Sequence, residues 1–138
     1  MFALTVKGGV GTSGPPDVCK TPTPGGPVPI PYVNIFQNSN ANISTVAKKV
    51  LIVGAMSLTI KSKIMLSSGD EPGTLGGVKS GTFIGPCKYQ NSSGSSIVKF
   101  EGQKALPMGA MTEQNGVSNF NTIGCCPMAA QTKVTVAK

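Results

Sequence analysis

Five prolines at near-alternate positions dominate residues 19–34, a stretch that we call the proline strap. It reads CKTPTPGGPVPIPYVN. Each proline fixes its φ angle and removes a backbone N–H donor, and the residue before each proline is pushed toward extended conformations. The strap therefore cannot form a helix or a central strand. We expect a stiff, extended, polyproline-like ribbon.

A ribbon of this composition has two interpretations. It can be a solvated linker or a ligand for another domain, or it can lie over a folded body. Val28, Ile30 and Tyr32 alternate along it, and a plain linker has no need of alternating apolar side chains. The alternation favours a strap that packs on the protein with these three side chains facing inward.

The rest of the composition indicates a β protein. The 138 residues include 18 glycines and 11 prolines, no tryptophan, and only 5% aromatic residues. A length of this order suits one domain with a modest core, so we expect a single domain over residues 1–138. Its core has to be built from small aliphatic side chains, methionine and close backbone contacts, which is typical of short strands and tight turns with little helix.

Charge and termini exclude some classes of protein. The net charge of +7 reflects twelve lysines against five acids, and there is no arginine. Without arginine, or clusters of basic and aromatic residues, a nucleic-acid partner is not expected. Residues 1–9 lack the basic and apolar regions of a signal peptide, and no apolar run approaches the length of a membrane span. We expect synthesis and assembly in the cytosol, where thiols stay reduced.

Two hairpins are predicted after residue 49. Residues 50–53 and 56–60 flank a turn at Gly54-Ala55, and residues 97–100 and 103–106 flank a turn at Glu101-Gly102. Residues 131–137 alternate apolar and polar side chains, which predicts a final strand.

The two hairpins are related by a shift of 48 residues. Separate blocks match in this one register: Val50 with Val98, Ile52 with Phe100, Gly54 with Gly102, Leu58 with Leu106, and Thr74-Leu75-Gly76 with Thr122-Ile123-Gly124. Agreement of two blocks indicates an internal repeat, with units at about 48–85 and 96–126. Repeated hairpins with little helix suggest a compact β-prism or wedge with pseudo-rotational symmetry.

The residues able to do chemistry are few. The chain has no histidine, which removes Ser-His-Asp triads, Cys-His pairs and histidine metal ligands. The five acids show no spacing that makes two of them converge, so we expect no enzyme. Four cysteines remain: Cys19, Cys87, Cys125 and Cys126.

Four thiolates form a complete ligand set for structural zinc. Cys125 and Cys126 are adjacent and would point to opposite faces of an extended strand, so both can ligate only if the backbone bends near Gly124 and Pro127. Inert buried thiols and disulfides formed after export are the alternatives. A domain poor in large apolar side chains gains from a metal staple, so we prefer a four-cysteine zinc site.

Two long motifs resemble the signature of PAAR-like proteins of contractile injection systems, which include type VI secretion. They are the proline strap and the later SGDEPGT-GGV-SGT pattern over residues 68–82. The resemblance covers roughly residues 15–115. It implies a small conical β domain, one copy of which caps and sharpens a trimeric VgrG-type spike that is driven through a target membrane. It also implies a metal ion, usually zinc, near the apex.

The sequence departs from that family pattern at two places. Val33 stands where another proline is usual, and residues 105–115 lack the histidines expected there. The leading interpretation is a non-enzymatic spike tip, assembled in the bacterial cytoplasm and found outside or in the target cell after firing. The alternative is an adaptor that links a separate toxin or effector chain to the spike.

Overall fold

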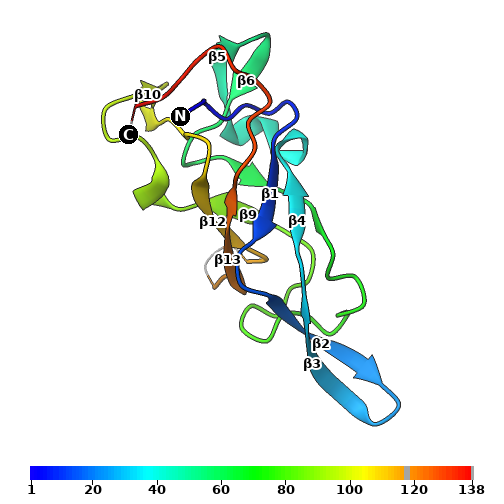
Figure 1. Ribbon diagram of the computed structural model, residues 1–138. Helices are drawn as coiled ribbons and strands as arrows, with labels where there is room; N and C mark the ends of the chain where they lie inside the picture. Colours follow the sequence, from blue (N-terminus) through cyan, green and yellow to red (C-terminus); the bar gives the residue numbers. More distant parts are fainter. Residues whose placement is uncertain (117–118, 138) are drawn as a thin grey trace.

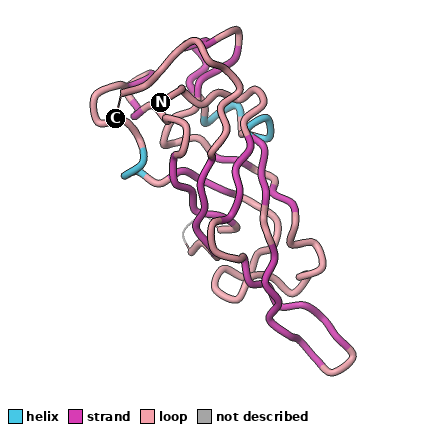
Figure 2. The backbone as a smooth tube through the Cα atoms, viewed as in Figure 1, coloured by secondary structure: helices cyan, strands magenta, loops and turns pink. Residues whose placement is uncertain are grey.

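A computed structural model describes residues 1–116 and 119–137, and this part of the chain is mainly β with no α-helix (Figures 1 and 2). The predicted fold class is confirmed: the protein is a small β wedge. Three single turns of 3-10 helix are present: η1 (Asn38–Asn40), η2 (Ile43–Thr45) and η3 (Asn91–Ser93). None of the described elements is a helix long and apolar enough to span a membrane.

Seven strands form one antiparallel sheet in the order β7-β9-β12-β13-β1-β4-β8. These strands are β1 (Val10–Ser13), β4 (Ile35–Gln37), β7 (Lys63–Ile64), β8 (Ser67–Ser68), β9 (Cys87–Tyr89), β12 (Ala110–Gln114) and β13 (Thr122–Cys126). Strand β13 lies between β12 and β1, where it pairs Cys125 with Met111 on one side and with Thr12 on the other. The sheet therefore joins residues from both ends of the chain.

The core is made of a few aliphatic side chains, as the composition predicts. Leu4, Leu58 and Leu106 are fully buried in one cluster, and Phe36 packs edge-on against Tyr89 with ring centroids 6.3 Å apart. The backbone of Leu4 links the other two leucines. Its N–H donates to the carbonyl of Leu106, and its carbonyl accepts from the N–H of Leu58.

Both predicted hairpins form, and they lie about 48 residues apart in the chain. Strands β5 (Ala47–Ile52) and β6 (Ala55–Ser57) form one hairpin, and β10 (Lys99–Phe100) and β11 (Gln103–Lys104) form the other. The predicted turn at Glu101-Gly102 is confirmed, whereas the first turn is one residue earlier than predicted, at Val53-Gly54. The 3-10 turns η2 and η3 also lie 48 residues apart. The hydroxyls of Thr45 and Ser93 donate to carbonyls three residues back at 2.6 and 2.7 Å.

The proline strap is extended, as predicted, but it does not lie over the body. Strand β2 (Asp17–Thr23) pairs with β3 (Gly26–Tyr32) at seven positions, and this hairpin projects from the tapered end of the molecule (Figure 1). The chain reverses at Gly26, whose φ is 111°. The inward packing predicted for Val28 is wrong: its side chain is 41% exposed, because the hairpin extends beyond the sheet.

The base of this hairpin is attached to the body through one edge of β2. The N–H of Lys20 donates to the carbonyl of Gly76 at 2.8 Å, and the N–H of Val78 donates to the carbonyl of Val18 at 3.0 Å. Prolines 27, 29 and 31 alternate with the residues of β3 that bond to β2. Because they lack an N–H, they occupy the positions whose amides would point away from β2, on the outer edge.

The final strand predicted over residues 131–137 is not formed. The structure has an isolated bridge between Phe2 and Thr135 there. The side chain of Gln131 explains the difference. Its Oε1 accepts from the N–H groups of Lys133 and Val134, and its Nε2 donates to the carbonyl of Ala3. A side-chain turn thus takes the backbone groups that a strand ladder would need.

Candidate metal centre

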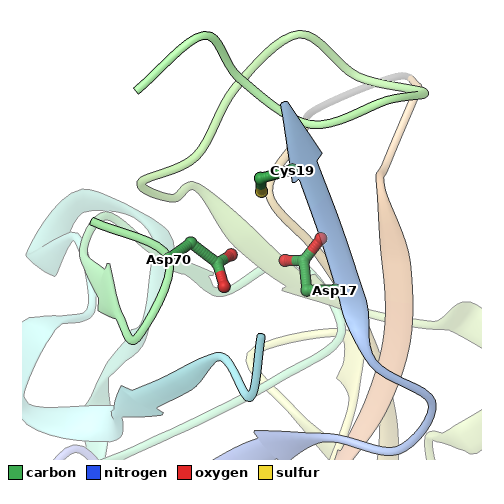
Figure 3. Close-up of side chains that lie close together, drawn as sticks. All are labelled: Asp17, Cys19 and Asp70. Atoms are coloured by element: carbon green, nitrogen blue, oxygen red, sulfur yellow. The ribbon is translucent and has the colours of Figure 1, made fainter. Parts of the chain in front are cut away.

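One cluster in the described part of the chain gathers three side chains that bind metals in proteins. The ligand atoms of Asp17, Cys19 and Asp70 all lie within 4.8 Å of one another, and the three side chains are fully buried. Asp17 and Cys19 are two residues apart on β2, so their side chains share one face of that strand. Figure 3 shows both facing Asp70, which comes from a separate loop.

Glycines bring the Asp70 loop close to the hairpin. Gly69 has a φ of 119°, and a Cβ there would overlap the carbonyl of Val33. Gly73 has no room for a Cβ either, because that atom would overlap the Cβ of Cys19. The N–H of Gly73 donates to the carbonyl of Asp70 at 2.8 Å, which closes a tight turn. Only glycine therefore fits at these two positions of the loop.

The amide of Asn115 joins the two carboxylates. Its Nδ2 donates to Oδ2 of Asp17 at 2.5 Å and to Oδ2 of Asp70 at 2.6 Å. Asn115 follows β12 in the left-handed region, with φ 57°, which asparagine tolerates better than most residues. Its Oδ1 accepts from the hydroxyl of Ser67 at 2.8 Å, so the amide orientation is fixed.

A second amide holds the other oxygen of Asp17. Nδ2 of Asn121 donates to Asp17 Oδ1 and, at 2.9 Å, to the carbonyl of Val18. Three of the four carboxylate oxygens in the cluster thus accept a hydrogen bond. The fourth, Oδ1 of Asp70, is buried and has no hydrogen-bond partner among the described residues. Such an orphaned acceptor is rare in folded proteins.

The electrostatics of the cluster favour protonation when nothing else neutralises it. Burial, followed by the neighbouring Asp17, raises the pKa of Asp70 to about 8. Burial, followed by Asp70 and Asp17, raises the pKa of the Cys19 thiol to about 12. Within the described residues the one ion pair is Lys88 with Glu113, so no cationic side chain there pairs with these acids. The cluster is a compact, buried set of acceptors that can hold a metal ion.

The other three cysteines that the sequence predicts as zinc ligands are not members of this cluster. Cys87 is buried on β9, and burial raises the pKa of its thiol to about 11. Cys126 is buried on β13 against Asn38 and the carbonyl of Val10. Cys125 precedes it in the same regular strand and is half-buried. In the residues described here, Cys19 is the one cysteine that joins a cluster of three or more potential ligands.

Sequence reasoning missed both carboxylates of the cluster. The spacing Asp17-x-Cys19 is a signal, because it places both side chains on one face of a strand, but residues 1–17 appear irregular from composition alone. Asp70 has no local signal apart from its place in the glycine-rich motif. The segment 105–115, in which histidines were expected, supplies Asn115 instead.

Comparison with known proteins identifies a family. A family model described as the toxin PAAR-like domain matches residues 11–124. No curated protein and no solved structure matches the chain.

Proposed function

Because the chain belongs to the toxin PAAR-like domain family, we propose that it is a structural, non-enzymatic tip. In this role one copy caps the trimeric spike of a contractile injection system and sharpens it for membrane puncture and effector delivery. The observation that carries the proposal is the taper of the molecule from a broad β body to the projecting β2–β3 hairpin (Figure 1).

The hairpin has the properties of a stiff point. Seven paired positions join its two strands, and its prolines restrict the backbone torsions. The glycine-rich loop that follows Asp70 is hydrogen-bonded to the base of the hairpin through Gly76 and Val78. A point of this kind transmits axial force to the sheet without needing a core of its own.

We assign spike docking to the broad end, opposite the hairpin. Hairpins β5–β6 and β10–β11 meet there around one buried cluster that contains Ile52, with Phe100 packed against it. The side chains of Leu51 and Val53 on the first hairpin are about three-fifths exposed. Apolar side chains exposed together on a small protein are typical of a surface that binds another protein.

Co-expression with a trimeric VgrG-type spike protein tests the proposal. We expect a complex with one chain per trimer by size-exclusion chromatography with light scattering. Leu51→Asp and Val53→Asp should weaken it, while the matched variant Val28→Asp on the hairpin should not. The absence of any complex with the spike proteins encoded beside it would overturn the tip assignment, and loss with Val28→Asp alone would reverse the orientation.

The adaptor function remains the second candidate, since the family description includes the word toxin. Addition of an effector chain to the same co-expression distinguishes the two. An adaptor retains the effector on the spike, whereas a plain tip forms the same complex without it. In either role we propose assembly in the bacterial cytoplasm and a final location outside the producing cell.

The proposal includes a structural zinc ion that stabilises the fold. The chain offers two ligand sets that share Cys19: the four cysteines predicted from the sequence, and the cluster with Asp17 and Asp70. The two sets make different predictions for single-residue variants, because only one contains carboxylates.

A further inference from the structure

We propose that Asp17, Cys19 and Asp70 bind one divalent cation of borderline softness, with Zn²⁺ as the preferred ion. The ligands would be a carboxylate oxygen from each aspartate and the sulfur of Cys19. The inference does not depend on spike docking, because it rests on the geometry and charge of this cluster alone.

The first argument is geometric. Zn–S bonds of about 2.3 Å and Zn–O bonds of about 2.0–2.2 Å place tetrahedral ligand atoms roughly 3.5 Å apart. The three ligand atoms already lie within 4.8 Å of one another, so small side-chain rotations bring them onto one ion. Two ligands come from one face of β2 and the third from the loop facing it (Figure 3). Three protein ligands leave a fourth position for water.

The second argument is the orphaned oxygen. Asp70 is fully buried, and its Oδ1 accepts no hydrogen bond from the described residues, whereas its Oδ2 accepts from Asn115. A buried acceptor without a donor is costly unless something else satisfies it. A cation at the centre of the cluster supplies the missing partner.

The third argument is charge. The carboxylates accept from the neutral amides of Asn115 and Asn121, and the described residues bring no cationic side chain into an ion pair with them. Buried acids in this state must either share protons or hold a cation. A thiol between two carboxylates favours the cation, because thiolate and carboxylate together suit Zn²⁺.

The two asparagines complete the site as outer-sphere groups. Metal-ligating carboxylates are usually themselves hydrogen-bonded, which fixes their orientation. Asn115 holds one oxygen of each aspartate, and the hydroxyl of Ser67 fixes its amide in turn. This arrangement leaves Oδ1 of Asp70 as the free ligand atom on that side.

Metal content of the full chain tests the site. The protein would be expressed with added Zn²⁺ and purified without chelator, and metal would be measured by mass spectrometry. We expect about one ion per chain in the wild type and in the carboxylate control Glu101→Gln. Cys19→Ser and Asp70→Asn should lose most of it. Replacement with Co²⁺ should give a thiolate-to-metal charge-transfer band that is absent in Cys19→Ser.

Other outcomes would overturn the proposal. Loss of metal in Cys125→Ser as well would assign the ion to the four-cysteine set. A wild-type chain that folds with Zn²⁺ present yet holds none would indicate a proton shared by the two aspartates. Because Asp70→Asn could unfold, the melting temperature of the wild type is a second readout: a chelator should lower it, and added Zn²⁺ should restore it.

Discussion

Val53 and Glu101, 48 residues apart, have the same left-handed backbone conformation, with φ values of 51° and 50°. Each is followed by a glycine at positive φ, Gly54 at 74° and Gly102 at 80°. Both pairs are therefore the central residues of the hairpin turn in which asparagine followed by glycine is preferred. The two turns share their backbone conformation but differ in the side chain at the first position.

Val53 is strained by this conformation, since a β-branched residue at positive φ is an outlier. Val53→Asn should raise the free energy of unfolding by about 1 kcal/mol. Glu101→Asn should gain less, because Oε2 of Glu101 accepts from the N–H of Lys49 at 3.2 Å. Denaturant unfolding of both variants measures the difference. Equal gains, or a loss in Val53→Asn, would contradict the account of strain.

Gly73 tests the packing of the Asp70 loop on the strap hairpin. A methyl group at this position would overlap the Cβ of Cys19 and approach the carbonyl of Asp70. Gly73→Ala should lower the free energy of unfolding by about 1–3 kcal/mol, the usual cost of overpacking. Gly25→Ala is the matched control, because nothing lies within 4 Å of the added Cβ. Similar melting temperatures for the two variants would show that the loop moves aside without cost.

Cys87 makes stability depend on alkaline pH. Burial raises the pKa of its thiol from 9.0 to about 11, so the folded chain keeps a proton that the unfolded chain loses. The stabilisation is complete below pH 9 and is lost as pH rises through 11. In Cys87→Ala the free energy of unfolding should fall less steeply over this window, by up to about 1.4 kcal/mol per pH unit.

The comparison of slopes isolates Cys87 from the other alkaline groups. Burial also raises the pKa values of Cys19, Tyr89 and Cys126, but these groups titrate in both proteins. The measurement is denaturant unfolding at several pH values with chelator present, so that metal binding does not contribute. Parallel curves for wild type and Cys87→Ala would refute the prediction.

The prolines of β3 should keep the hairpin from pairing with other chains. Pro29→Thr restores a backbone N–H on the outer edge of β3, where an unpaired strand can accept a partner. We expect concentration-dependent dimers or larger species by light scattering, and more of them when Pro27 and Pro31 are also replaced. Pro24→Thr is the control, because Pro24 lies in the turn between the strands. A monomeric triple variant would contradict this role.

Local signals predicted the parts of the fold that depend on local chemistry. Glu101-Gly102 is a strong turn signal between two alternating runs, and that hairpin is correct. Gly54 gave the same signal, but it takes the second position of the turn, after Val53. The prediction of a final strand was wrong because the alternation in residues 131–137 does not reveal that the Gln131 side chain bonds to the backbone of this segment.

The residues of the candidate site could be predicted only in part from the sequence. Counting the cysteines identified Cys19 as a candidate ligand, but its neighbours in the cluster are set by the tertiary structure. Asp70 is 51 residues away along the chain and reaches the cluster through a loop shaped by Gly69 and Gly73. The proline strap was predicted to be extended, since proline fixes its own torsions. It was not predicted to fold back on itself, although the two-residue turn at Pro24-Gly25 fixes the register of the β2–β3 hairpin.

The position of Leu4 between Leu58 and Leu106 affects the order of folding. Its amide bonds to the carbonyl of Leu106, and its carbonyl bonds to the amide of Leu58. Leu4 therefore meets its second partner only after about a hundred further residues have been made. Long-range contacts of this kind slow folding. This part of the core closes only once Leu106 has been made, and a chain truncated before that residue leaves Leu4 without that partner.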